Sequence, residues 1–74
     1  MTYTEILRDI HKYPFVYISY RIKYKRDKLR CIQCTSRNFV NWQYMLFRSE
    51  ELKGNIEIVD LGFTAKDYIT LFKR

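Results

Sequence analysis

Apolar and polar side chains alternate from position 15 to position 25, in the segment FVYISYRIKYK. Successive side chains of a β-strand point to opposite faces of a sheet, so this pattern predicts a long strand. The face expected to be apolar and buried comprises Val16, Ile18, Tyr20, Ile22 and Tyr24. The face expected to be exposed, basic and partly aromatic comprises Phe15, Tyr17, Ser19, Arg21, Lys23 and Lys25.

A helix is predicted before this strand, over residues 2–12. Thr2 and Glu5 have the spacing of a capping box, in which each side chain accepts a hydrogen bond from the other residue's backbone. Apolar residues then recur at helical spacing, at Ile6, Leu7 and Ile10. Pro14 ends the helix, because the residue before a proline is forced out of the helical conformation. The apolar side of this helix is narrow, and we expect it to pack on a sheet.

A second strand is predicted over residues 29–35, paired with the first as a hairpin. The turn would contain Arg26, Asp27 and Lys28. A three-residue loop places Lys23 opposite Cys31, whereas a two-residue loop places Lys23 opposite Arg30. Directly opposed like charges are destabilising, which favours the longer loop. Both registers give the hairpin a basic tip.

Residues 39–53 fit two interpretations. An alternation of apolar side chains favours a strand over residues 39–47, followed by a short helical turn; its members are Val40, Trp42, Tyr44 and Leu46. The alternative is a helix over residues 39–53, with Asn38 as its cap and Gly54 in a left-handed conformation after its last turn. In either case we expect the aromatic cluster of Trp42, Tyr44 and Phe47 to lie in the core, since a small domain needs large buried side chains.

A third strand is predicted over residues 56–61, where Ile56 and Ile58 alternate with Glu57. Thr64 begins a second capping pattern, and a helix is expected over residues 64–73. The sequence therefore predicts one domain over residues 1–74, of the α+β class. Its architecture would be a small antiparallel β-sheet with an N-terminal and a C-terminal helix packed on one face.

The net charge of +6 is concentrated in the first half of the chain. Residues 1–37 contain nine Lys or Arg against three Asp or Glu, whereas residues 38–74 contain five of each. Six of the basic residues fall within positions 21–30, with Asp27 as the one acid there. Such asymmetry indicates a polyanionic partner, namely nucleic acid, an anionic membrane surface or an acidic protein surface. The alternative is that the charge only keeps a small protein in solution.

The cationic hairpin is the strongest candidate for a binding site. Basic side chains along a strand can meet successive phosphates, and a tyrosine on the same face can stack on a base. The residues predicted to bind nucleic acid, whether DNA or RNA, are Tyr17, Arg21, Lys23, Lys25, Arg26, Lys28, Arg30 and Arg37.

The sequence gives no sign of an enzyme, a metal site or a cofactor. Cys31 and Cys34 form a lone C-x-x-C, His11 is the only histidine, and a structural zinc ion needs four ligands. Residues three apart on a strand also point to opposite faces, which is wrong for joint ligation. With two glycines in the chain, a glycine-rich phosphate loop is not possible. We therefore expect a binding protein that uses no cofactor.

No apolar run approaches the ~20 residues of a membrane span, and the N-terminus does not have the pattern of a secretory signal, so we expect a cytoplasmic location. The first hypothesis is a small basic accessory protein that binds nucleic acid. The alternative is a protein-interaction module or inhibitor that docks on a host nucleic-acid-processing enzyme. The small size and the richness in Lys, Tyr and Ile are typical of phage and viral accessory proteins, and a homodimer is compatible with both hypotheses.

Overall fold

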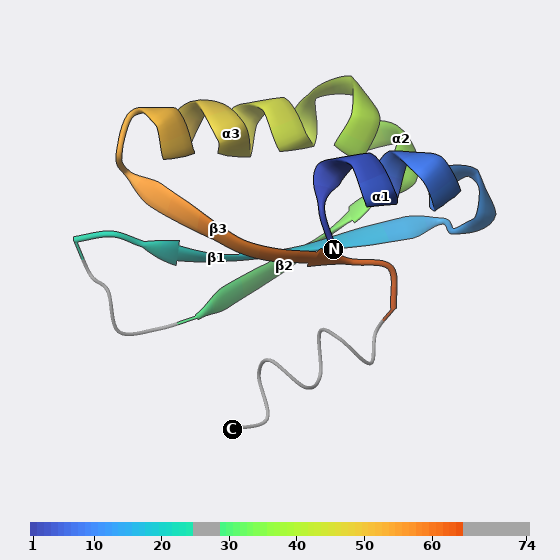
Figure 1. Ribbon diagram of the computed structural model, residues 1–74, viewed down its shortest axis with the longest axis horizontal. Coiled ribbons are helices and arrows are strands. Elements are labelled where there is room, and N and C mark those ends of the chain that lie inside the picture. Colours follow the sequence, from blue (N-terminus) through green and yellow to red (C-terminus); the bar gives the residue numbers. More distant parts are fainter. Residues whose placement is uncertain (25–28, 65–74) are drawn as a thin grey trace.

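The structure is a computed structural model that describes residues 1–24 and 29–64, and it contains a three-stranded antiparallel sheet with helices on one face (Figure 1). The strands lie in the order β2–β1–β3, with bounds Arg30–Thr35, Phe15–Ile22 and Ile56–Gly62. The helical segments are α1 (Tyr3–Asp9), the 3₁₀ turn η1 (Ile10–Lys12), α2 (Ser36–Asn38), the π-helical turn η2 (Phe39–Gln43) and α3 (Tyr44–Leu52). The α+β class is confirmed.

The N-terminal helix forms as its sequence predicts. The Thr2 hydroxyl accepts a hydrogen bond from the Glu5 backbone N–H at 3.2 Å, and the Glu5 carboxylate accepts one from the Thr2 N–H at 2.7 Å. This bond to the Thr2 backbone is the main reason why the pKa of Glu5 lies below its usual value. The helix continues through η1 to Lys12, just before Pro14, so the predicted capping box and end are both confirmed.

The register of β1 with β2 differs from both predicted hairpins. Tyr20 lies opposite Arg30 and Ile18 opposite Ile32, so the tight-loop registers that placed Lys23 opposite Cys31 or Arg30 are wrong. The observed register brings apolar side chains of both strands to the same covered face, and burial is what normally fixes register. Beyond Tyr20, β1 pairs with β3 alone. The predicted turn at residues 26–28 lies outside the described residues.

Residues 36–52 are helical, so the predicted strand over residues 39–47 is wrong. Thr35, the last residue of β2, caps this helix by accepting a hydrogen bond from the Asn38 N–H at 3.1 Å. Gly54 follows the last turn with φ +83°, as expected for the helical alternative. Its N–H donates to the Glu51 carbonyl at 3.0 Å, which closes the helix end.

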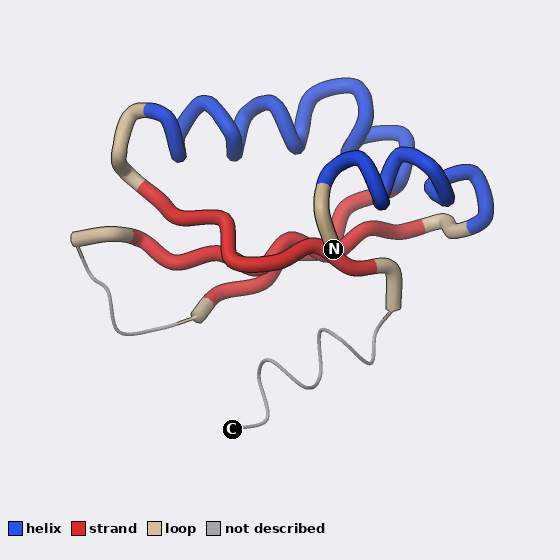
Figure 2. Tube along the Cα trace, in the orientation of Figure 1, coloured by secondary structure: helices blue, strands red, loops and turns tan. Residues whose placement is uncertain are grey.

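The α2–α3 helix and α1 cover the same face of the sheet (Figures 1 and 2). Between them lies the core, made of Ile6, Val16, Ile18, Cys34, Phe39 and Leu61. The second helix that covers the sheet therefore comes from the middle of the chain. The sequence analysis had predicted that a C-terminal helix would take this place. The helix expected over residues 64–73 lies outside the described residues, apart from Thr64.

The middle of β1 is buried on both faces, whereas the sequence analysis predicted that one of its faces would be exposed. Tyr17 and Ser19 point away from the helices, yet they are 8% and 2% exposed. Exposure on that face begins at Arg21, near the end of the strand. Cys31, opposite Ser19, and Cys34, opposite Val16, lie on different faces of β2, as expected. Among the residues described, no helix is long and apolar enough to cross a bilayer.

Candidate nucleic-acid interface

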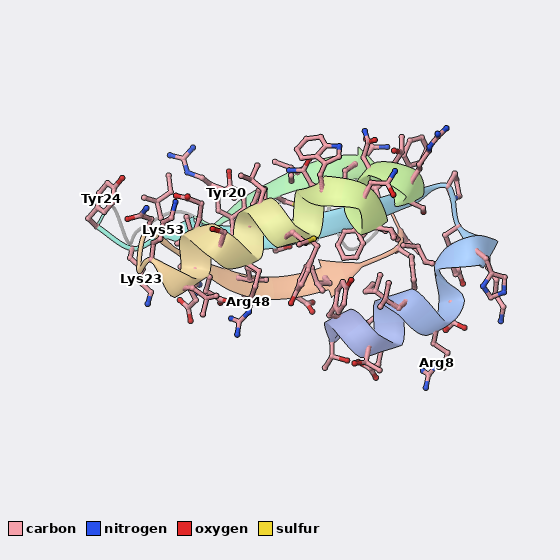
Figure 3. All side chains as sticks on the ribbon, turned by 90° about the horizontal axis from the view of Figure 1, so that it is seen from above. Arg8, Tyr20, Lys23, Tyr24, Arg48 and Lys53 are labelled. Carbon is pink, nitrogen blue, oxygen red and sulfur yellow. The ribbon has the colours of Figure 1, made fainter. Side chains whose placement is uncertain are left out.

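Two segments distant in sequence meet at one end of the sheet. The end of β1 leads into Lys23 and Tyr24, and the turn after α3 contains Lys53 and Asn55. The Lys23 backbone N–H donates to the Asn55 carbonyl at 3.0 Å, which fixes the two segments together. Figure 3 shows Lys23, Tyr24 and Lys53 at this end of the molecule. We call the surface formed by Arg21, Lys23, Tyr24 and Lys53 the cationic end.

The nearest carboxylate on the helical turn is occupied by contacts within the protein. Glu50 accepts a hydrogen bond from the Asn55 side-chain amide at 2.9 Å and pairs with the Lys53 ammonium at 3.4 Å. These contacts, the Asn55 bond first, hold the pKa of Glu50 below its usual value. The carboxylate therefore stabilises the turn as an anion, and it also partly offsets the charge of Lys53.

Arg21 and Lys23 carry charge that the described residues do not neutralise. Both side chains are exposed, and neither forms an ion pair within residues 1–24 and 29–64. Glu57 lies opposite Arg21 in the register with β3, but no ion pair joins them. Two exposed cations next to each other on a β-strand end are therefore open to an anionic ligand.

The other predicted residues are distributed over the molecule. Arg30 is half-buried opposite Tyr20, and Arg37 is exposed in α2, at the far end of the sheet where Thr35 pairs with Phe15. The length of β1 separates Arg37 from the cationic end by roughly 20 Å. Lys25, Arg26 and Lys28 lie outside the described residues. Tyr17 is too buried to offer its ring to a partner.

Tyr24 is a candidate that the sequence analysis missed. Alternation assigned it to the buried face, but the strand ends at Ile22 and the tyrosine is 77% exposed. Alternation does not determine which way a side chain points once the strand has ended. The available signal in the sequence was the predicted turn at residues 26–28, which requires the strand to end before it. Tyr24, and not Tyr17, is therefore the exposed tyrosine next to Arg21 and Lys23.

A second surface lies between α1 and α3. It is a hollow of about 480 Å³, lined by Tyr3, Tyr44, Met45, Arg48, Ser49 and Leu52. Two of these lining residues, Tyr3 and Tyr44, stack with ring centroids 4.0 Å apart. The predicted aromatic core is confirmed for Tyr44 and Phe47, which pack against the core, but it is wrong for Trp42, which is 48% exposed.

The described residues show no gathering of three or more His, Cys, Asp or Glu side chains that could ligate a metal ion. Burial raises the pKa of the Cys34 thiol to about 11, which makes it a poor nucleophile at neutral pH. Comparison with protein-family models, with curated proteins and with solved structures finds no match to this chain. Inference about function therefore depends on the geometry of the two surfaces.

Proposed function

We propose that the protein binds nucleic acid through its cationic end, as a small accessory protein with no catalytic activity of its own. The observation that supports this most directly is the pair Arg21 and Lys23, exposed and without a carboxylate partner among the described residues, beside the exposed ring of Tyr24. Lys25, Arg26 and Lys28 follow directly in sequence, and they add three positive charges to this part of the sequence.

The chemistry favours single-stranded nucleic acid. Arg21 lies near the end of β1 and Lys23 directly follows the strand, so two exposed cations lie close together in the chain and can contact phosphates along an extended nucleic-acid strand. Tyr24 is 77% exposed, and any base can stack on an exposed tyrosine ring, so binding would show little sequence preference. Within a duplex the bases are paired and stacked on each other, so only the phosphate contacts remain and the stacking on Tyr24 is lost.

Matched charge removals test the position of the site. We expect Lys23→Gln to weaken binding to a labelled single strand and to lower the slope of log affinity against log salt by about 0.7. Lys12→Gln removes the same charge from an exposed side chain before the start of β1, so it is the control and is expected to leave that slope nearly unchanged. Fluorescence anisotropy at two salt concentrations measures both quantities.

A second pair of variants tests stacking. Tyr24→Ala is expected to cost about 1–3 kcal/mol of binding free energy, as for other single-strand binders, while Tyr24→Phe keeps the ring and the affinity. Equal losses for Lys23→Gln and Lys12→Gln would show that only overall charge matters. Absence of measurable affinity for single- or double-stranded DNA or RNA at low salt would end the proposal.

A second candidate is a protein-interaction module, such as an inhibitor that docks on a nucleic-acid-processing enzyme. The observation that favours it is the hollow between α1 and α3, beside which Met45 and Leu52 are 66% and 72% exposed. Exposed apolar side chains around a hollow suit a partner that inserts an apolar anchor. A specific partner retained after nuclease treatment, lost in Leu52→Asp and kept in Lys23→Gln, would favour this candidate.

A further inference from the structure

The outer side of the α2–α3 helix carries large apolar side chains. A surface helix normally turns an apolar side to the core and a polar or charged side to water. The core side is present here, because Phe39 is fully buried. On the same helix, however, Trp42 and Leu46 are 48% and 50% exposed, and Met45 and Leu52 are 66% and 72% exposed. Exposed apolar side chains gathered on one element mark a binding surface.

These four side chains share the half of the helix that faces away from the sheet, which we call the outer helix surface. Met45 and Leu52 lie two helical turns apart, and Trp42 and Leu46 lie about one turn apart, so they form two neighbouring rows along the helix axis. The rows extend over roughly 15 Å at the helical rise. In Figure 1 the helices form the outermost layer of the described structure, so this surface is open to a partner.

Cations lie at both ends of the outer helix surface. Arg37 is exposed in α2, before the first apolar residue of this surface. Lys53 is exposed directly after α3, close to Lys23 of the cationic end, and Arg48 is exposed within α3 (Figure 3). An anionic partner that covers the apolar rows therefore meets basic side chains along their length.

The two acids of the helix are turned toward the rest of the protein. Glu51 accepts a hydrogen bond from the Ile58 backbone N–H at 3.1 Å, and Glu50 accepts one from the Asn55 side chain at 2.9 Å. The same carboxylates pair with the two basic residues at this end of the helix, but ion pairs at an exposed surface are weak. The outer helix surface therefore combines apolar side chains with cations.

We propose that the outer helix surface binds an anionic lipid bilayer, with the α2–α3 helix lying in the plane of the membrane interface. The four apolar side chains enter the boundary between headgroups and acyl chains, while Arg37 and Lys53 reach the lipid phosphates through their long aliphatic stems. Binding of this kind increases with the apolar area buried and with the negative charge of the lipids. Tryptophan is favoured at this boundary, because its ring is apolar and its N–H is polar. The inference goes beyond nucleic-acid binding and uses a largely different set of side chains.

A bilayer suits this surface better than a protein does. A partner seated in the hollow beside α1 would contact Met45 and Leu52, which line it, but would leave Trp42 and Leu46 exposed. A flat lipid surface can cover both rows at once. A second copy of the chain, packed through the same surface, would bring like charges together, because each copy supplies cations there while its carboxylates are bonded elsewhere.

The test measures binding of nucleic-acid-free protein to vesicles at physiological salt, where attraction by charge alone is largely screened. Trp42 is the one tryptophan of the chain, so its emission reports directly on the outer helix surface. Vesicles of phosphatidylcholine and phosphatidylserine are expected to shift the emission to the blue, and brominated acyl chains in the same mixture to quench it. Vesicles of phosphatidylcholine alone are expected to bind more weakly, because they lack anionic headgroups.

A matched pair of double variants locates the contact. Met45→Ser with Leu52→Ser removes apolar area at two exposed positions without changing the charge, and is expected to weaken vesicle binding at least about tenfold. The control, Met45→Leu with Leu52→Met, keeps the apolar area and is expected to bind as the wild type does. Both variants leave Lys23 and Tyr24 in place, so the affinity for single-stranded nucleic acid should be unchanged in each. Failure of either binding activity can therefore be recognised separately from the other.

Three results would overturn the proposal. One is the absence of wild-type binding to vesicles that contain phosphatidylserine, a measurement that needs no variant to fold. Another is binding without a blue shift of Trp42, or with equal affinity in the serine variant and its control, which would show adsorption by charge alone. The third is a chain that is dimeric without lipid by sedimentation equilibrium and monomeric in the serine variant, which would assign the surface to a second copy.

Discussion

The carboxylate of Glu51 in α3 accepts a hydrogen bond from the backbone N–H of Ile58 in β3 at 3.1 Å. The other oxygen of the same carboxylate pairs with the Arg48 guanidinium. One side chain thus satisfies an edge-strand donor and fixes the helix over that edge. This contact therefore covers part of the outer edge of β3.

Glu51→Ala is expected to lower the free energy of unfolding by about 1–3 kcal/mol, because it leaves a half-buried backbone donor without its partner. The control is Arg48→Ala, which removes the surface ion pair alone and should cost less than about 1 kcal/mol. Urea denaturation of the three proteins measures the difference. Equal losses for both variants would show that the contact with Ile58 contributes little.

A second prediction concerns the start of the helix over residues 36–52, which comprises α2, η2 and α3 and is called the middle helix below. Thr35→Ala removes the hydroxyl that accepts from the Asn38 N–H, and should lower the free energy of unfolding by about 1 kcal/mol. Thr35→Ser keeps a capping hydroxyl and is expected to stay close to wild type. If the serine variant is as unstable as the alanine variant, the loss arises from strand packing of Thr35 and the cap is not its cause.

The elements that the sequence predicted correctly are those with a local signal at each end. Thr2 and Glu5 begin α1, Pro14 follows its last turn, and alternation marks the buried residues Val16 and Ile18. Gly54 was identified as a left-handed position even though the helix before it was not preferred. Such signals depend on neighbouring residues alone, which is why they can be recognised without knowledge of the fold.

The middle helix could not be identified from its pattern because its apolar residues are not all buried. Trp42 and Leu46 share a face in the strand interpretation and also in the helix, and both are half-exposed. The buried residue is Phe39, which the alternation set aside. The true cap, Thr35, is also the last residue of β2, so the strand pattern concealed it.

The candidate site was predicted in part. Arg21 and Lys23 are exposed and adjacent, as expected from their position near the hairpin. Tyr17 was misplaced because the sequence does not show that the central strand is covered on both faces at that point. Tyr24 was missed because the strand ends at Ile22, three residues before the alternation ends at position 25. The first error concerns the burial of a sheet face and the second the length of a strand. Both properties depend on the rest of the chain.

Truncation of two residues in the middle helix distinguishes its buried and exposed sides. Phe39 is fully buried and contacts the rings of Tyr3 and Tyr44, at centroid distances of 5.9 and 5.5 Å. Phe39→Ala is therefore expected to cost about 3–5 kcal/mol of unfolding free energy. Met45→Ala, at a 66% exposed position, should stay within about 0.5 kcal/mol of wild type. Similar effects of both truncations in urea denaturation would contradict the packing described.

Acid should weaken the turn that supports the cationic end. The Asn55 amide and the Lys53 ammonium hold the pKa of Glu50 below its usual value of 4.5. A carboxyl whose pKa is lower in the folded state contributes stability above its unfolded pKa, and this contribution is lost as the pH falls through the folded pKa. We therefore expect the thermal midpoint of unfolding to decrease as the pH is lowered from about 5 to about 3. The decrease should be smaller in Glu50→Gln, because glutamine keeps an acceptor for Asn55 but does not titrate. The control is Glu57→Gln, which removes the same charge from an exposed carboxylate that has no hydrogen bond among the described residues. If Glu57→Gln reduces the acid dependence as much as Glu50→Gln does, net charge is the cause and the contact with Asn55 is not.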